Sequence, residues 1–232
     1  MAEKPGTLML FARAPVAGGV KTRLAGVLGF DGATRLYRAF LEDAARIYAN
    51  GPWEPVLYAE PDPEEPSLAA IFGAPWRREA QVEGDLGRRL SQAFRAERSR
   101  GAPAVLAVGS DHPALERASL VALFEAVRRD RDAAVIPARD GGYCAIALSA
   151  GVDPSAAFDG IPWSSADTLA ATLERMGRRG VGVAVLDPGY DVDRPEDLER
   201  LRLDLARRDP KEDDYPRSTA VALAEFAPET PA

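Results

Sequence analysis

Residues 7–12 read Thr-Leu-Met-Leu-Phe-Ala, and this apolar run lies between Pro5-Gly6 and Pro15. A short continuous apolar run between turn residues predicts a strand that is buried on both faces of a sheet. Runs of the same kind recur along the chain at residues 55–59, 104–108, 133–137, 143–148 and 181–186. Because helical patterns separate most of these runs, the sequence predicts an α/β fold, a three-layer α/β/α sandwich with a mostly parallel, mixed sheet.

The predicted helices have one apolar face each. The clearest is residues 32–49, where Leu36, Phe40, Ala44 and Ile47 recur at intervals of three and four. Further helices are expected at residues 22–28, 85–99 (with Asp85 as the cap), around 120–127, at 165–179 and from Pro195 to about 205. After Arg208 the composition becomes acidic. We therefore expect one domain over residues 1–208 and a tail, residues 209–232, that either docks on the domain or stays mobile.

Composition excludes several classes of protein. A chain of 232 residues with a net charge of −7 suits one α/β domain and disfavours a nucleic-acid binder, which needs a basic surface. The single cysteine, Cys144, excludes an internal disulfide and a cysteine-based zinc site. No run of about 18 apolar residues is present, and the apolar stretch near the N-terminus is too short for a signal peptide. We expect a soluble cytoplasmic protein.

The loop after the first strand carries two glycines, Gly18 and Gly19, and two cations, Lys21 and Arg23. Glycines let backbone amides approach an anion, and a helix that begins nearby adds the positive end of its dipole. A di- or triphosphate would suit this loop. It is not a Walker A loop, which needs glycine where this chain has Val20. The alternative is a flexible, solvated loop.

Asp111 follows the strand at residues 104–108, in the sequence Gly109-Ser-Asp-His-Pro113. A carboxylate at the mouth of a buried strand is costly without a partner, so Asp111 is a candidate ligand for Mg²⁺. The alternative is a helix cap. His112, the only histidine, is a candidate base, but a hydrogen-bonded structural residue is the more common case.

Asp191 and Asp193 are two residues apart in an extended segment, so their side chains share a side and one of them could complete a metal site with Asp111. Asp193 also suits the cap of the helix that begins at Pro195. Residues 140–143, Asp-Gly-Gly-Tyr, suit either a hairpin turn or a tight turn that presents amides and the Tyr143 ring to a substrate.

Two weaker segments have polar and aromatic groups at predicted helix starts. Residues 81–89 could bring Arg88 or Arg89 to an anion, and residues 161–165 could place Trp163 and Ser164 at a pocket. Each segment could equally be a solvated or capped turn.

Taken in order, the motifs KTRL, GDLG, GSDHP, DGGY, PWSS and DVDRPEDL resemble the GT-A (nucleotide-diphospho-sugar transferase) superfamily over residues 7–205. Within it, they look like the family named for association with radical-SAM and selenocysteine-containing domains, whose members often carry the label glycosyltransferase. More distantly, the chain is similar to the molybdenum-cofactor and coenzyme F420 nucleotidyltransferases. The resemblance implies a GT-A, Rossmann-like fold.

The resemblance also implies roles for individual residues. Lys21, Arg23 and Asp111 are the expected catalytic residues, and Asp111 and Asp193 the expected ligands of Mg²⁺ or Mn²⁺. With Lys21 and Arg23, the expected nucleotide- or substrate-binding residues are Arg13, Pro15, Gly18, Gly19, Asp140, Gly141, Gly142, Tyr143, Trp163 and Ser164.

Three functions remain open, all with a nucleotide as ligand. In nucleotidyl transfer, a small anionic acceptor attacks the α-phosphorus of a nucleoside triphosphate and pyrophosphate leaves. In glycosyl transfer, a hydroxyl group attacks the sugar of a nucleotide-sugar, which normally requires a base. The cationic loop, the single Asp after the strand and the shortage of bases favour nucleotidyl transfer. The third function is a non-catalytic, nucleotide-binding regulatory module.

Overall fold

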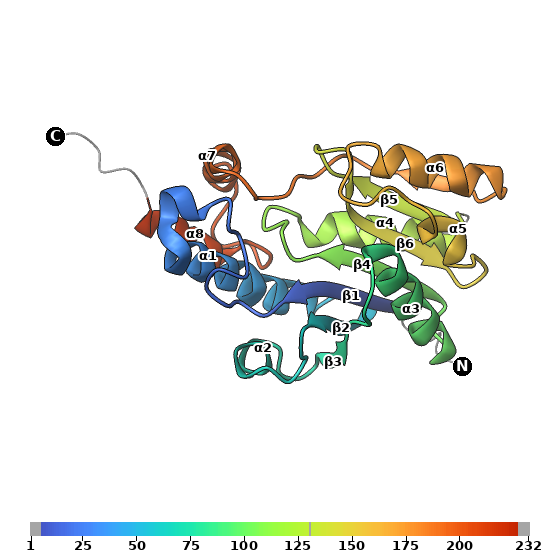
Figure 1. The fold of residues 1–232 in the computed structure, drawn as a ribbon, viewed down its shortest axis with the longest axis horizontal. Helices are drawn as coiled ribbons and strands as arrows, with labels where there is room; N and C mark the ends of the chain where they lie inside the picture. Colours follow the sequence, from blue (N-terminus) through green and yellow to red (C-terminus); the bar gives the residue numbers. More distant parts are fainter. Residues whose placement is uncertain (1–5, 130, 227–232) are drawn as a thin grey trace.

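A computed structural model describes residues 6–129 and 131–226, and within them seven strands form one sheet with the order β3-β2-β1-β4-β6-β5-β7 (Figure 1). The strands are β1 (Gly6–Arg13), β2 (Trp53–Glu60), β3 (Arg77–Ala80), β4 (Ala104–Gly109), β5 (Ala133–Pro137), β6 (Tyr143–Ser149) and β7 (Val183–Val185). Only β6 runs antiparallel to its neighbours, β4 and β5. The predicted mixed, mostly parallel sheet is therefore confirmed.

Helices cover both faces of the sheet. They are α1 (Ala25–Tyr48), α2 (Pro66–Ile71), α3 (Leu86–Ser99), α4 (Arg117–Arg129), α5 (Ser155–Phe158), α6 (Thr168–Arg178), α7 (Pro195–Leu205) and α8 (Arg217–Glu225). None of the described helices is long and apolar enough to cross a membrane.

Successive side chains of β1 pack into two different hydrophobic cores, one on each face of the sheet. Leu8 and Leu10 belong to a core shared with α1, α4 and α7, whereas Met9 belongs to a second core shared with α3, α5 and α6. Successive side chains of a strand point to opposite faces, so a strand that is apolar throughout needs a cover on each side. This arrangement is the predicted three-layer sandwich.

The helices predicted near the first loop and the cap predicted for α3 are confirmed. Element α1 consists of two helices that meet at a kink at Gly29 (φ 68°, ψ 165°), where the sequence predicted separate helices at residues 22–28 and 32–49. Asp85 caps α3, as expected, by accepting a hydrogen bond of 2.8 Å from the Arg88 amide. The short elements α2, β3 and α5 were not predicted.

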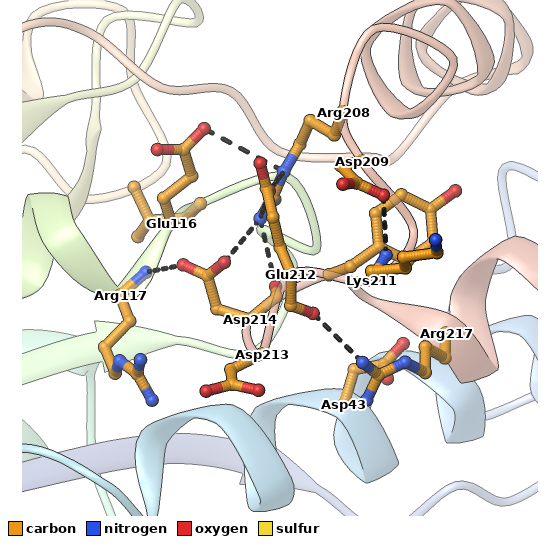
Figure 2. A network of polar contacts seen from close by, with 12 residues as sticks. Asp43, Glu116, Arg117, Arg208, Asp209, Lys211, Glu212, Asp213, Asp214 and Arg217 are labelled. Carbon is orange, nitrogen blue, oxygen red and sulfur yellow. Dashed lines mark hydrogen bonds and ion pairs between the residues drawn. The ribbon is translucent and has the colours of Figure 1, made fainter.

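Residues 209–226 pack on the rest of the molecule, and α8 lies beside α1 (Figure 1). The buried Asp43 carboxylate of α1 accepts hydrogen bonds from the amides of Thr219 (2.7 Å) and Ser218 (3.2 Å) at the start of α8. Figure 2 shows the adjoining network, in which Asp214 accepts from Arg208 at 2.8 Å and from the first amide of α4 at 3.3 Å. The rest of the expected tail, residues 227–232, lies outside the described residues.

Candidate active site

A cavity of about 780 Å³ opens where β1 and β4 end. Parallel strands in α/β sheets present their carboxyl ends to ligands, and β1 and β4 are neighbours in this sheet. Residues 19–23, 84–86, 109–111 and 163–164 line the cavity, together with Arg13, Tyr37, Glu60, Gln81, Arg89 and Asp193. The cavity therefore brings together residues from five of the six motifs that the sequence singled out.

The ammonium group of Lys21 lies between two carboxylates. Its Nζ atom is 2.6 Å from Oδ1 of Asp111 and 2.7 Å from Oδ1 of Asp193. The Lys21 side chain is 3% exposed, whereas those of Asp111 and Asp193 are 42% and 34% exposed. The cation is thus buried behind its two partners, which face the cavity.

The backbone around Lys21 directs its side chain inward. Lys21 has a φ of 48°, in the left-handed region that residues other than glycine rarely adopt. Its carbonyl accepts a 2.9 Å hydrogen bond from the Leu24 amide, which closes the turn into α1. The rings of Tyr37 and Phe40 lie 6.0 and 5.9 Å from the ammonium nitrogen. Backbone strain of this kind persists only where the surroundings enforce it.

The side chain of Asp193 does not cap helix α7, so it can contact Lys21 instead. The helix-capping role expected of Asp193 is not observed, because Asp197 accepts hydrogen bonds from the amides of Asp193 (3.1 Å) and Arg194 (2.8 Å). The cap of α7 therefore comes from within the helix, and the Asp193 carboxylate contacts Lys21.

The charges in this cluster stabilise one another. Burial alone would lower the pKa of Lys21, but Asp111 and Asp193 outweigh it and hold that pKa above its ordinary value of 10.5. Burial alone would raise the pKa of Asp193, but Lys21 and Arg23 hold it below its ordinary value of 3.8. Both groups are charged at neutral pH.

A second cluster of charges lies on the cavity wall around Glu60. The Glu60 carboxylate accepts hydrogen bonds from Arg89 at 2.6 and 2.9 Å and from Arg13 at 3.1 Å. These guanidinium groups, that of Arg89 above all, lower the pKa of Glu60. Gln81 bonds the backbone carbonyls of β1 and β2 and accepts from Arg89 at 3.2 Å. Of the two arginines considered in residues 81–89, Arg89 lines the cavity.

Arg23 and the aromatic segment complete the wall. Arg23 lies 3.4 Å from Asp193, and its side chain is 66% exposed. Trp163 packs against the rings of Tyr143 and Phe158, at centroid distances of 6.2 and 6.5 Å. Ser164 follows with a φ of 58° and lines the cavity. The segment thus combines a packed indole with a hydroxyl residue at the wall.

Several expected binding residues do not line the cavity: Pro15, Gly18, Asp140, Gly141, Gly142 and Tyr143. The turn at residues 140–142 is explained by structure alone. Asp140 accepts a 2.9 Å hydrogen bond from the Gly142 amide, and a side chain at Gly141 (φ 92°) would lie 2.1 Å from the Ala166 carbonyl oxygen. This turn packs against the start of α6.

His112 is also placed as a structural residue. It is 9% exposed, and its Nδ1 atom is 3.1 Å from the Tyr190 carbonyl oxygen. Burial lowers the pKa of its imidazole. It is absent from the cavity wall, so no histidine faces a ligand bound there.

The carboxylate oxygens of Asp111 and Asp193 suit a metal ion that is bound by the protein and the substrate together. Mg²⁺ prefers oxygen ligands and is often bound through one or two carboxylates plus substrate phosphates. Asp111 and Asp193 supply two such carboxylates from different motifs. Within residues 6–129 and 131–226, no group of three or more His, Cys, Asp or Glu side chains is placed to hold a metal. The remaining ligands would therefore come from substrate or water.

Sequence reasoning missed Tyr37 and Glu60. The Tyr37 hydroxyl accepts a 3.1 Å hydrogen bond from the Arg13 amide and lies 2.8 Å from the Ser110 hydroxyl, so it links the ends of β1 and β4. Burial raises the pKa of its phenol. Tyr37 lies within an ordinary amphipathic helix and Glu60 at the end of a strand, so neither carried a local signal.

Comparison with known proteins shows similarity to a protein family, to a named relative and to solved structures. A family model described as "Uncharacterized protein conserved in bacteria (DUF2064)" matches residues 43–165. The phosphoenolpyruvate guanylyltransferase of Rubrobacter xylanophilus is 33% identical over 202 residues, which are 84% of this chain and 94% of that protein. A candidate nucleotide-diphospho-sugar transferase of Desulfovibrio desulfuricans G20 is 30% identical, covers 95% of this chain and 97% of its own, and has a TM-score of 0.84.

A cytidylyltransferase of Leptospira borgpetersenii shares the fold at a TM-score of 0.59 and 14% identity, covering 96% of this chain and 93% of its own. At that identity the similarity concerns the fold alone. The two relatives at 30% identity or above confirm the transferase class and the nucleotide-diphospho-sugar transferase fold that the motifs indicated.

Proposed function

The chain belongs to the bacterial DUF2064 family, and on this premise we propose that it transfers a nucleotidyl group from a nucleoside triphosphate to a small anionic acceptor. The observation that carries the proposal is the buried Lys21 ammonium between Asp111 and Asp193, at the wall of a cavity that Arg23 also lines. Such a site offers positive charge to a polyphosphate and carboxylates to a metal ion, which are the two requirements of phosphoryl-group chemistry.

In the proposed reaction, an oxygen atom of the acceptor's anionic group attacks the α-phosphorus of the donor. A new P–O bond forms, the bond between the α-phosphorus and the bridging oxygen of the β-phosphate breaks, and pyrophosphate leaves with that oxygen and its electron pair. Lys21 and Arg23 neutralise the negative charge that builds on the departing pyrophosphate. The protein contributes mainly position and charge.

The proposal needs no general base. An acceptor phosphate is already ionised at neutral pH, so no proton has to be removed before attack. This suits a cavity whose described wall contains no histidine. A hydroxyl acceptor, as in glycosyl transfer, would need a carboxylate as the base. The acidic side chains on the described wall already have partners: Asp111 and Asp193 bind Lys21, Glu60 binds Arg13 and Arg89, and Asp85 accepts from the Arg88 amide.

We assign Asp111 and Asp193 as the protein ligands of Mg²⁺ or Mn²⁺. When bound, the metal would supply Lewis-acid stabilisation of the phosphate oxygens. The protein's own part is to hold the two carboxylates at one place on the wall, through Lys21 and through the neighbouring backbone.

The relative from Rubrobacter suggests which substrates to test first. Its name specifies a guanylyl group and phosphoenolpyruvate, a phosphorylated carboxylic acid. We infer that the donor here is GTP and that the acceptor is phosphoenolpyruvate or a similar three-carbon phosphorylated acid. The Arg13–Glu60–Arg89 cluster and the Lys21 cluster both face the cavity, which provides cationic groups on two parts of its wall.

The test is release of pyrophosphate from each of the four nucleoside triphosphates, with Mg²⁺, in the presence of phosphoenolpyruvate, 2-phosphoglycerate or 2-phospholactate. We expect release only with one triphosphate and one acceptor together, and a product whose mass equals acceptor plus nucleoside monophosphate minus water. Asp111→Asn should abolish this release, and Asp187→Asn is its matched control, because Asp187 is exposed and lies outside the cavity wall.

Glycosyl transfer is the second candidate, and the relative from Desulfovibrio favours it. Glycosyl transfer predicts that a nucleoside diphosphate is released from a UDP- or GDP-sugar and that no pyrophosphate is released. Binding of nucleotides without turnover across both panels would instead support a regulatory module.

A further inference from the structure

Lys21 occupies the place between Asp111 and Asp193 where a cation shared by both carboxylates would lie. Its Nζ atom contacts Oδ1 of one carboxylate at 2.6 Å and Oδ1 of the other at 2.7 Å. The Lys21 side chain is only 3% exposed, so water does not screen these contacts well. The pair of carboxylates is therefore neutralised to a large extent before any ligand arrives.

We propose that Lys21 is a built-in countercation that keeps the free protein from binding a divalent metal ion tightly, and that the donor's polyphosphate releases this block by giving the ammonium a new anionic partner. The inference rests on the metal assignment within the proposed function. Its consequence is an order of binding, in which the metal ion enters together with the polyphosphate and not before it.

The argument is electrostatic. A Mg²⁺ ion bound to the same Oδ1 atoms, at metal–oxygen distances of about 2.1 Å, would lie within about 5 Å of the ammonium nitrogen. Two like charges at that distance repel strongly where water is largely excluded. Removing the lysine charge would leave the negative charges of the two carboxylates without the ammonium that compensates them, and a divalent ion would then bind there more tightly.

The surroundings allow the exchange of partners. The outer faces of Asp111 and Asp193 are open to the cavity, so phosphate oxygens can reach the cluster. A triphosphate brings more negative charge than either carboxylate. It can therefore bind the ammonium and share the metal ion with the two carboxylates, which relieves the repulsion between the two cations.

The experiment measures Mn²⁺ binding without nucleotide, by calorimetry and by the loss of the free-ion paramagnetic resonance signal. It compares the wild type with Lys21→Met. We expect Lys21→Met to bind Mn²⁺ at least about tenfold more tightly. We also expect Mg²⁺ to raise its melting temperature while leaving that of the wild type unchanged. Arg23→Met is the matched control, because it removes an exposed cation whose contact with Asp193 is longer. It should change Mn²⁺ affinity much less.

Lys21→Gln guards against a failure of Lys21→Met to fold, since glutamine retains hydrogen-bond donors without the charge. Equal Mn²⁺ affinity in the wild type and both variants would overturn the proposal, and so would tight Mn²⁺ binding by the free wild type. The gain in Lys21→Met must also disappear when Asp193→Asn is added. Because no turnover is measured, these results stay separate from any failure to release pyrophosphate.

Discussion

The backbone amide of Val192 donates a 2.9 Å hydrogen bond to the carbonyl oxygen of Asp111. This bond ties the segment before α7 to the loop that leaves β4. Asp193, the next residue, therefore points its carboxylate at the same ammonium group as Asp111. The meeting of the two acids depends on backbone geometry as well as on their attraction to Lys21.

Asp111→Asn should remove metal-dependent activity and leave folding almost intact. The amide keeps a hydrogen-bond acceptor for Lys21 but loses the charge that a metal ligand needs. We expect kcat/KM to fall at least about 100-fold. We expect the free energy of unfolding to fall by only about 1 kcal/mol, because the amide oxygen still accepts a hydrogen bond from Lys21 and Asp193 remains as its charged partner. Activity measured against Mg²⁺ concentration and urea unfolding check this. An unchanged metal dependence would remove Asp111 from the site.

Lys21→Ala should weaken use of the donor more than use of the acceptor. We expect KM for the nucleoside triphosphate to rise at least about tenfold, because the variant loses a charged hydrogen-bond donor to phosphate. KM for the acceptor should change much less. Steady-state kinetics with each substrate varied in turn give both values. Lys211→Ala, at an exposed lysine outside the cavity wall, is the matched control. Equal effects on both substrates would contradict the role assigned to Lys21.

The stabilising effect of the Lys21 cluster should depend on pH at both extremes. The pKa of Lys21 is raised above 10.5 in the folded protein, so its contribution is complete below that pH and is lost as the pH rises through the native value. The pKa of Asp193 is lowered below 3.8, so its contribution is complete above that pH and is lost as the pH falls through the native value.

Urea unfolding of the wild type and Lys21→Met across the pH range tests this. We expect the difference in unfolding free energy between the wild type and Lys21→Met to be constant between about pH 3.8 and pH 10.5. Below and above that range the difference should shrink. A difference that does not vary with pH would mean that Lys21 stabilises the protein by packing alone.

Asp43→Ala should destabilise the protein and loosen residues 209–226. The variant leaves the amides of Ser218 and Thr219 without their acceptor and removes the carboxylate that pairs with Arg46 at 3.3 Å, although Arg46 keeps its bonds to backbone carbonyls. We expect a loss of about 2 kcal/mol, between that of a helix cap and that of a buried ion pair. Chemical denaturation measures the loss, and limited proteolysis should cut this segment sooner. Glu42→Ala is the control, because it removes an exposed ion pair with Arg38 on the same helix. An equal loss of unfolding free energy in this control would contradict the role of Asp43 as an acceptor for the first amides of α8.

Features that depend on neighbouring residues could be predicted from the sequence. The buried strands are continuous apolar runs, and the Asp85 cap needs only the first turn of its helix. Strand β3 escaped prediction because its sequence, Arg-Arg-Glu-Ala, lies at the sheet edge and is only partly buried. An edge strand can be polar and still complete a ladder, so it leaves no apolar pattern to detect.

In the site, too, residues with a local sequence pattern could be predicted, and residues whose role depends on distant partners could not. Its main ions, Lys21, Asp111 and Asp193, were identifiable because each lies in a loop with a recognisable pattern. Glu60 was not, since its importance comes from Arg13 and Arg89, which reach it from separate elements. The direct contact of the Lys21 ammonium with both carboxylates also could not be foreseen, because it depends on the left-handed backbone at that residue and on the cap that Asp197 supplies.

The ion pair between Lys21 and Asp193 joins residues that are 172 positions apart. In a growing polypeptide, the loop that carries Lys21 leaves the ribosome early, whereas Asp193 leaves it only after most of the chain has been made. A nascent fragment that ends at β7 (Val183–Val185) therefore contains Lys21, Arg23 and Asp111 but not Asp193, the residue that completes their cluster. The Lys21 cluster is therefore completed late in synthesis, when the segment before α7 packs beside the end of β1.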